Sequence, residues 1–332
     1  MIARRVVLAG AVVLCLAAVG CSSKAASTTS SGATSATTPA QTTKLTVGTS
    51  PTISNASLYL ATEDGTFAKN NLDVTPVVIQ SGAQAIPQLL NGQIQFAAAD
   101  PLSSILTISK NVPLEIVVGG NVVPSDQSKD PSGLIAKGSS SIQSLAGLDG
   151  KTVAVNALNS LAQVGLEAAI DAKGGNSKSV KFVEVGFPQM VAAVQSGTVD
   201  AAATNEPFIT AAKAAGDREI PFGGLATSMA GVPQVVYLTS KSYASSHPDV
   251  VKAFAASINA ADTTLGQNPG LIRTVGAKST TINAATLAKI TLPYFGPKLS
   301  LDSLTKLETL MVKYGVLSAP VQNLGQSIYG GS

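Results

Sequence analysis

Side chains that commonly carry catalysis or hold metals are scarce in this sequence. Its 332 residues contain a single histidine, His247, and two cysteines, Cys15 and Cys21. A Ser-His-Asp or Cys-His site needs a histidine beside its nucleophile, and a protein zinc site usually needs several histidines or cysteines. We therefore expect no catalytic residue, no metal ion and no cofactor.

Cys21 is the residue whose surroundings suggest a covalent modification. Arg4 and Arg5 precede the apolar run Val6–Val19, which is too short for a membrane span of about 20 residues. Together with the small residue Gly20 just before the cysteine, this pattern is typical of a lipoprotein export signal. We expect cleavage before Cys21 and a lipid on its sulfur. An ordinary signal peptide with a chance cysteine is the alternative.

The N-terminal region therefore divides into a signal peptide at 1–20 and a tether at 21–43. The tether consists almost entirely of Ser, Thr, Ala and Gly, so it cannot bury enough apolar surface to fold and should be flexible. The mature domain is expected outside the cytoplasm, held at the cell membrane by its lipid anchor. The remaining residues are enough for two lobes.

Composition argues against nucleic acid as a partner. Hydrophobic residues make up 45% of the chain, charged residues 12%, and the formal net charge is +3. This composition is globular, and no cluster of arginines or lysines forms a basic patch.

Polar residues follow several of the expected strands at their carboxyl ends. In open α/β sheets a ligand binds beyond these ends, where the N-termini of the following helices converge. This rule gives the candidate ligand contacts, to which Asn121 is added because it lies near an expected crossover between two halves of the chain. The candidates are Ser50, Asn55, Ser81, Asp100, Asn121, Asn156, Ser160, Phe187, Asn205 and Glu206.

Several candidates also have a purely structural interpretation. Ser81, Asp100 and Ser160 are residue types that cap helix N-termini, so they could cap helices and touch no ligand. Glu206 precedes a proline and could bond to the first turn of its own helix. Phe187 could belong to the hydrophobic core.

Strands and helices are expected to alternate along the chain. Leu45, Val47 and Thr49 alternate with polar neighbours and predict a first strand. A long helix is expected at 248–265, where apolar residues recur at helical spacing. The alternation predicts an α/β fold whose mostly parallel sheets are flanked by helices. Further strands are expected at 74–80, 94–99, 114–118, 151–155, 180–185, 199–203 and 235–239.

The two halves of the chain share one short pattern. Asn91–Ala97 matches Ser196–Ala202, since each has a glycine that stops a helix and then a strand of small and branched residues. Because the match lies within two similar series of strands and helices, it indicates two related α/β lobes.

Five segments carry a resemblance to a known family: Gly65–Val74, Leu89–Ile94, Leu145–Val155, Ser196–Phe208 and His247–Phe254. The sequence resembles the extracytoplasmic solute-binding proteins of ABC importers, nearest to the family for alkanesulfonates, nitrate, taurine and thiamine-precursor pyrimidines. Three residues depart from the family pattern: Asn71 replaces a glycine, Gln95 an aspartate and Asn205 an aromatic residue.

The resemblance implies a two-lobed periplasmic-binding-protein type II fold with two hinge crossovers, near 119–124 and 233–239. Lobe I would comprise 44–120 and 238–332, and lobe II 121–237. A small organic solute, such as a sulfonate, taurine or a thiamine pyrimidine, would be held between the lobes. The protein, expected to be a monomer, would deliver it to a membrane permease driven by ATPase subunits.

Two other functions fit the same resemblance. One is a ligand-sensing lipoprotein that docks on a receptor. The other is an enzyme on the same fold, like the related thiamine-pyrimidine synthases. Those enzymes depend on histidine and cysteine clusters, which this sequence lacks.

The distribution of arginine bears on the charge of the ligand. No arginine occurs from Lys44 to Asp217, so only Arg218 or Arg273 could clamp a sulfonate or carboxylate, and neither follows an expected strand. An anion would have to rely on helix N-termini and hydroxyl groups. Asp100 and Glu206 would oppose it if both face the cleft, so a neutral or amine-bearing solute fits better.

Overall fold

The structure is a computed structural model that describes residues 42–79, 82–280, 283–296 and 298–330. The predictions for the signal peptide, for Cys21, for most of the tether and for Ser81 lie outside these residues. Within the described ranges, no helix is both long enough and apolar enough to cross a membrane.

Five strands form the first sheet: β1 (Thr43–Thr49), β2 (Leu72–Val78), β3 (Phe96–Ala99), β4 (Leu114–Gly119) and β10 (Val236–Ser240). Their order is β2-β1-β3-β10-β4. β2 and β3 both pair in parallel with β1, whereas β10 runs antiparallel to its neighbours β3 and β4. Only the strand that returns from the second half of the chain therefore runs against the others.

The second sheet has the same plan. Its strands are β5 (Ser132–Ala136), β6 (Thr152–Val155), β7 (Lys181–Glu184), β8 (Ala201–Asn205) and β9 (Arg218–Ile220). Their order is β7-β6-β8-β5-β9, and β5, the first strand after the crossover, is antiparallel to both of its neighbours. The expectation of mostly parallel sheets is confirmed. The sequence patterns missed β5 and β9.

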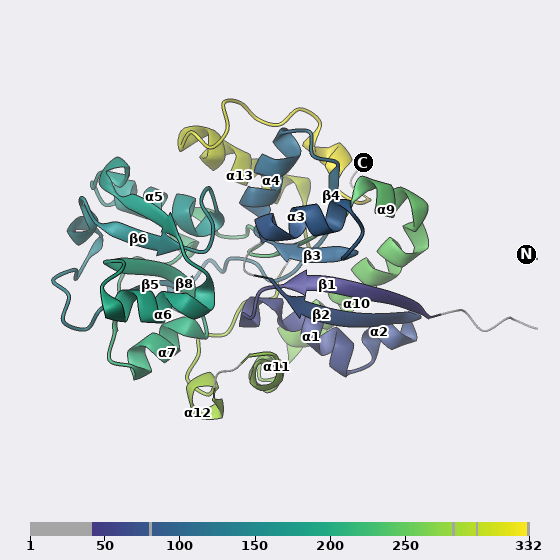
Figure 1. The fold of residues 1–332 in the computed structure, drawn as a ribbon, viewed down its shortest axis with the longest axis horizontal. Coiled ribbons are helices and arrows are strands. Elements are labelled where there is room, and N and C mark those ends of the chain that lie inside the picture. Colours follow the sequence, from purple (N-terminus) through teal and green to yellow (C-terminus); the bar gives the residue numbers. More distant parts are fainter. Residues whose placement is uncertain (1–41, 80–81, 281–282, 297, 331–332) are drawn as a thin grey trace, which may run out of the picture. The chain divides into compact units, whose positions relative to one another are not determined.

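Helices cover both faces of the first sheet (Figure 1). One hydrophobic cluster joins this sheet to α1 (Ala56–Glu63), α2 (Thr66–Lys69), α9 (Lys241–Ser246), α10 (Pro248–Gln267), α11 (Leu271–Ser279) and α12 (Ala284–Leu287). A second cluster, on the opposite face, joins it to α3 (Gly82–Leu90), α4 (Pro101–Ser109), α13 (Leu301–Lys313) and the 3₁₀ turn η5 (Leu324–Ser327). The expected helix at 248–265 is α10.

The second sheet is also covered on both faces. Because side chains alternate along a strand, Val153 and Val155 pack with α5 (Leu161–Ala172), while Ala154 between them packs with α6 (Phe187–Ser196) and α7 (Phe208–Ala214). Shorter helical turns complete the fold: η1 (Ile53–Asn55), η2 (Gln127–Lys129), η3 (Leu145–Leu148), η4 (Ser177–Ser179) and α8 (Ala226–Met229).

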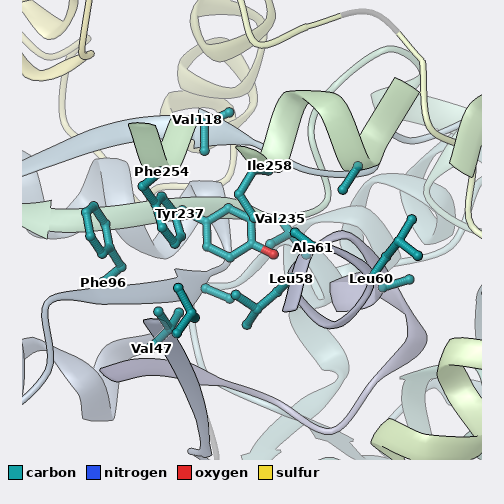
Figure 2. Packing of buried hydrophobic residues seen from close by; sticks show 14 of the residues in the cluster. Val47, Leu58, Leu60, Ala61, Phe96, Val118, Val235, Tyr237, Phe254 and Ile258 are labelled. Carbon is teal, nitrogen blue, oxygen red and sulfur yellow. The ribbon is translucent and has the colours of Figure 1, made fainter. Parts of the chain in front are cut away.

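Phe254 of α10 is at the centre of the first core cluster (Figure 2). Its ring stacks on Phe96 of β3 with centroids 4.0 Å apart, and on Phe67 of α2 at 5.5 Å. It meets Tyr237 of β10 edge-on at 5.6 Å. Such offset and edge contacts add about 0.5–1.5 kcal/mol each to the burial of the rings. One helix residue thus ties together β3, β10 and α2.

Two chain segments, 120–131 and 221–235, connect the sheets and run side by side. Gly120 N donates to Val235 O at 2.9 Å, Gln234 N to Asn121 O at 2.8 Å, and Val123 N to Val232 O at 2.8 Å. The crossovers expected near 119–124 and 233–239 overlap these segments. The expected lobe boundary after Tyr237 falls inside β10, because that strand already begins at Val236.

The shared sequence pattern corresponds to a shared structure. Gly92 and Gly197 both end a helix with φ of 77°. The residues three positions later play the same part: Thr46 N donates to Gln95 Oε1 at 2.8 Å, and Thr152 N donates to Asp200 Oδ2 at 2.8 Å. Gln95 thus accepts a hydrogen bond from a strand backbone in the first sheet, as Asp200 does in the second. Asn71, which stands where the family has glycine, adopts the left-handed conformation with φ of 57°.

A buried polar contact joins α1 to α10. The hydroxyl of Ser57 on α1 donates a hydrogen bond to the Asp262 carboxyl on α10. Removal of this carboxyl from water raises its pKa to about 7, more than the bond from Ser57 lowers it.

Stability should therefore fall as the pH rises from about 4 to about 7. In that window the unfolded chain loses the proton of Asp262 while the folded chain keeps it, a difference on the order of 4 kcal/mol. Chemical denaturation of Asp262→Asn across this range should give a shallower pH dependence than the wild type. Asp73→Asn, on the exposed side of edge strand β2, is the control and should leave the slope unchanged. Equal slopes for wild type and Asp262→Asn would contradict the prediction.

Candidate functional site

A pocket lies at the carboxyl ends of strands from both sheets. Its cavity volume is about 60 Å³, which is room for about four or five water molecules or a small solute. Six of the predicted ligand contacts line it: Ser50, Asn55, Asp100, Asn156, Phe187 and Asn205. The strand-end rule thus brings together residues that are far apart in the sequence.

Two pairs of these residues occupy equivalent positions in the two sheets. Ser50 follows β1 and Asn156 follows β6, the strands that hold equivalent places in their sheets. Asp100 follows β3, and Asn205 is the last residue of β8, again at equivalent places. The internal repeat of the fold therefore puts one polar pair on each side of the pocket.

Asn55 has its amide nitrogen fully engaged inside the protein. Nδ2 donates to the backbone oxygen of Ser50 at 2.9 Å, to its hydroxyl at 3.1 Å and to the hydroxyl of Thr52 at 3.2 Å. Because a backbone carbonyl can only accept, the Ser50 contact fixes which end of the amide is nitrogen. Asn55 Oδ1 and the neighbouring Ser54 Oγ are buried and have no partner among the described residues.

Asp100 links helices from the two sheets. Oδ1 accepts from Ser103 N at 2.9 Å and so caps α4, and Oδ2 accepts from Leu161 N at 2.8 Å in the first turn of α5. Asp100 therefore caps a helix, as one interpretation held, and also lines the pocket. Loss of water around the carboxyl raises its pKa to about 6, although the bonds from Ser103 and Leu161 lower it. At neutral pH the group is mostly ionised.

Gly82, the first residue of α3, allows the backbone to approach the pocket closely. A Cβ atom at this position would lie 2.5 Å from Ala99 Cβ and 2.8 Å from Ala99 Cα. Both residues line the pocket. A side chain at position 82 would push α3 away from the end of β3.

Two predicted contacts lie just behind the lining. Ser160 is buried and caps α5, where its hydroxyl accepts from Gln163 N at 3.4 Å. Asn121 is buried at the crossover and donates through Nδ2 to Oε1 of Gln234, which itself lines the pocket. Neither side chain forms part of the pocket surface, so any effect on a ligand would pass through a neighbour.

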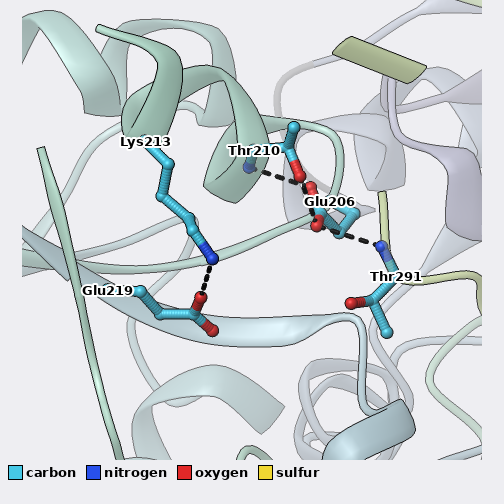
Figure 3. Close-up of polar contacts among 5 residues, drawn as sticks. All are labelled: Glu206, Thr210, Lys213, Glu219 and Thr291. Carbon is cyan, nitrogen blue, oxygen red and sulfur yellow. Dashed lines mark hydrogen bonds and ion pairs between the residues drawn. The ribbon is translucent and has the colours of Figure 1, made fainter. Parts of the chain in front are cut away.

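Glu206 also lies outside the lining and is engaged by the protein (Figure 3). Oε2 accepts from Thr210 N at 3.0 Å, and Oε1 accepts from the Thr210 hydroxyl at 2.7 Å and from Thr291 N at 3.2 Å. The carboxyl caps its own helix α7, as the alternative interpretation held, and also holds the segment after α12. Burial raises its pKa more than these bonds lower it.

Sequence patterns missed Ser132 and Gln234, which line the pocket from β5 and from the crossover before β10. Gln234 Nε2 donates to Ser132 Oγ at 3.1 Å and to Asp130 Oδ1 at 3.4 Å. Asp130 in turn accepts from Ala226 N at 2.7 Å. The crossover thus supplies its own network of polar contacts beside the pocket. The only sequence feature that could have indicated Ser132 is its place as a polar residue between Pro131 and the apolar run that forms β5.

The two arginines and the histidine singled out earlier lie elsewhere. Arg218 donates to Gly138 O at 3.0 Å and to Ser140 O at 3.4 Å, and Arg273 donates to Ile290 O at 3.4 Å. His247 is exposed before α10, where its ring stacks on Tyr243 at 4.4 Å. None of the three lines the pocket. In the described ranges, no cluster of histidine, cysteine and acidic residues could hold a metal ion.

Glu206→Ala should destabilise the protein. The change leaves the partly buried donors on Thr210 and Thr291 without their acceptor, which should lower the free energy of unfolding by about 2–4 kcal/mol in chemical denaturation. Glu219→Ala is the matched control: it removes a neighbouring carboxylate whose 2.8 Å ion pair with Lys213 is exposed, and should change stability by at most about 1 kcal/mol. A Glu206→Ala protein with wild-type stability but no response to solute would instead assign this carboxyl to ligand binding.

Comparison with known proteins places the chain in a family. A family profile described as NMT1/THI5 like matches residues 52–270. The taurine-binding periplasmic protein of Escherichia coli strain K12 is 28% identical over 200 residues, which are 60% of this chain. The match spans 59% of that protein's own length.

Solved structures share the fold at low sequence identity. The alkanesulfonate-binding protein SsuA from Xanthomonas axonopodis pv. citri, bound to MOPS, has a TM-score of 0.71 at 20% identity and covers 87% of this chain and 99% of its own. The nitrate-binding protein NrtA from Synechocystis PCC 6803 has a TM-score of 0.67 at 15% identity and covers 86% and 84%. These similarities confirm the periplasmic-binding-protein type II fold. With its profile match extending over more than half of the sequence, the chain belongs to the NMT1/THI5-like family.

Proposed function

We propose that this chain is the solute-binding component of an ABC importer and that it works outside the cytoplasm. It captures a small organic solute in the pocket between two lobes, leaves it unaltered and delivers it to a membrane permease with ATPase subunits. The observation that carries the proposal is the pocket itself, lined by equivalent strand ends of two sheets that are connected by two adjacent crossovers.

The two lobes are the two sheets with the helices packed on them. Closure would turn one lobe against the other about the paired segments 120–131 and 221–235. The bond from Leu161 N to Asp100 Oδ2 is one contact of the closed form, because its partners belong to different lobes. A solute that touches both Asp100 and Asn205 would add to the same contact surface and favour closure.

The surroundings of the pocket support binding without turnover. Its polar lining consists of hydroxyl and amide side chains and one carboxylate; in the described part of the chain no histidine, cysteine or lysine lines it. The roles of the taurine-binding and alkanesulfonate-binding relatives support the same conclusion. A sensing lipoprotein would use the same pocket and closure, and no observation in the described residues favours it.

A solute that fits should stabilise the protein and compact it. At a hundredfold excess over its dissociation constant, a ligand that binds only the folded state adds about 2.7 kcal/mol. The test is a thermal-shift screen of sulfonates, pyrimidines, amines and small acids, followed by X-ray scattering with each hit. Stabilisation with a smaller radius of gyration and unchanged solute is expected. If no solute shifts the melting temperature, or if a hit is chemically converted, the proposal is wrong.

We also propose that Cys21 carries the lipid that holds the mature protein at the membrane. The full chain, expressed in a bacterial host with labelled fatty acid, should incorporate label and sediment with membranes. Cys21→Ser should lose the label, whereas Cys15→Ser, within the expected signal peptide, should keep it. Equal labelling of the two variants would contradict lipidation at Cys21.

A further inference from the structure

The charges around the pocket restrict the solute that it takes, provided that the proposed binding function holds. Asp100 is the one lining side chain that carries a charge, and in the described part of the chain no lysine, arginine or histidine joins it. Arg218 and Arg273 bond to backbone oxygens elsewhere. Burying an anion beside a carboxylate with no cation nearby is unfavourable, because like charges repel strongly away from water.

Helix N-termini are the usual substitute for a cation in anion binding. At this pocket Asp100 already uses two of them, since its oxygens accept from Ser103 N in α4 and from Leu161 N in α5. The N-termini of α1, α3 and α6 also reach the pocket, at Asn55, Gly82 and Phe187. Each contributes only about half a positive charge, so the Asp100 carboxylate remains the one full charge on the lining in the described part of the chain.

One neutral side chain of the pocket, Asn55, can only accept a hydrogen bond from the solute. Asn55 spends its amide nitrogen on Ser50 and Thr52, and this leaves its buried Oδ1 without a partner among the described residues. Ser54 Oγ, which is also buried and belongs to a lining residue, likewise has no hydrogen-bond partner among the described residues. Buried polar atoms in folded proteins are nearly always paired, so these two call for a partner from the solute. For the amide oxygen that partner must be a donor.

We propose that the solute carries a protonated amino group, with the Asp100 carboxylate as its counter-ion and Asn55 Oδ1 as an acceptor for a further N–H. Anions that lack an amino group are excluded. The apolar part of the lining, which includes Ala98, Leu161 and Phe187, faces the carbon skeleton. The small cavity limits this skeleton to a few carbon atoms.

The test uses pairs of probes that differ in one group. Calorimetry at pH 7.5 compares n-butylamine with butanesulfonate, and taurine with ethanesulfonate, which is taurine without its amino group. Each amine should bind at least tenfold more tightly than its partner. Asp100→Asn should weaken the binding of the amines at least tenfold. Asp64→Asn, an exposed aspartate that accepts from Thr66 N at the start of α2, should leave it unchanged.

The possible results separate this inference from the proposed function. Equal or tighter binding of the sulfonates overturns the amine requirement and leaves solute binding intact. Wild-type affinity for amines in Asp100→Asn also overturns it. The comparison of probes on the wild-type protein needs no variant, so it decides the matter even if Asp100→Asn fails to fold. If neither class of probe binds, and no solute of the wider screen binds either, both the proposed binding function and this inference are wrong.

Discussion

The Asp100 carboxylate accepts hydrogen bonds from the first turns of two helices that belong to different sheets. A single ionised group therefore fixes the distance between α4 and α5 and places their N-termini at one pocket. The same group supplies the only charge on the pocket lining in the described chain. Two tasks that could conflict, joining the lobes and selecting a solute, meet at this residue. A solute must be compatible with a carboxylate that already accepts hydrogen bonds from α4 and α5.

The pocket owes its symmetry to the repeated plan of the sheets. In each sheet two neighbouring strands end in a polar residue at the pocket: Ser50 and Asp100 in the first sheet, Asn156 and Asn205 in the second. The two pairs lie on opposite sides of the cavity. The repeat tolerates changes in detail: Gln95 and Asp200 differ in charge and still accept hydrogen bonds from equivalent backbone donors, Thr46 N and Thr152 N. The two halves have diverged where the solute would lie, since Asp100 on one side corresponds to Asn205 on the other. This asymmetry gives the pocket its charge.

Sequence patterns predicted most of the fold, because strand alternation and helix starts depend on neighbouring residues, and six of the ten candidate residues line one pocket. Ser132 escaped because β5 is buried on both faces and shows no alternation. Gln234 escaped because it lies on a crossover, outside the strand ends that the rule covers. The position of Glu206 required knowledge of Thr291, a partner that no local pattern connects to it. The misses are thus contacts between distant segments.

The position of β10 has a consequence for how the chain can assemble. This strand lies between β3 and β4, yet it is synthesised only after the whole second sheet. A nascent chain that ends before Val236 leaves β3 and β4 without the strand that pairs with both of them. The first sheet is therefore completed late, and the N-terminal half cut from the rest would lack the inner strand that joins β4 to the other strands of the sheet.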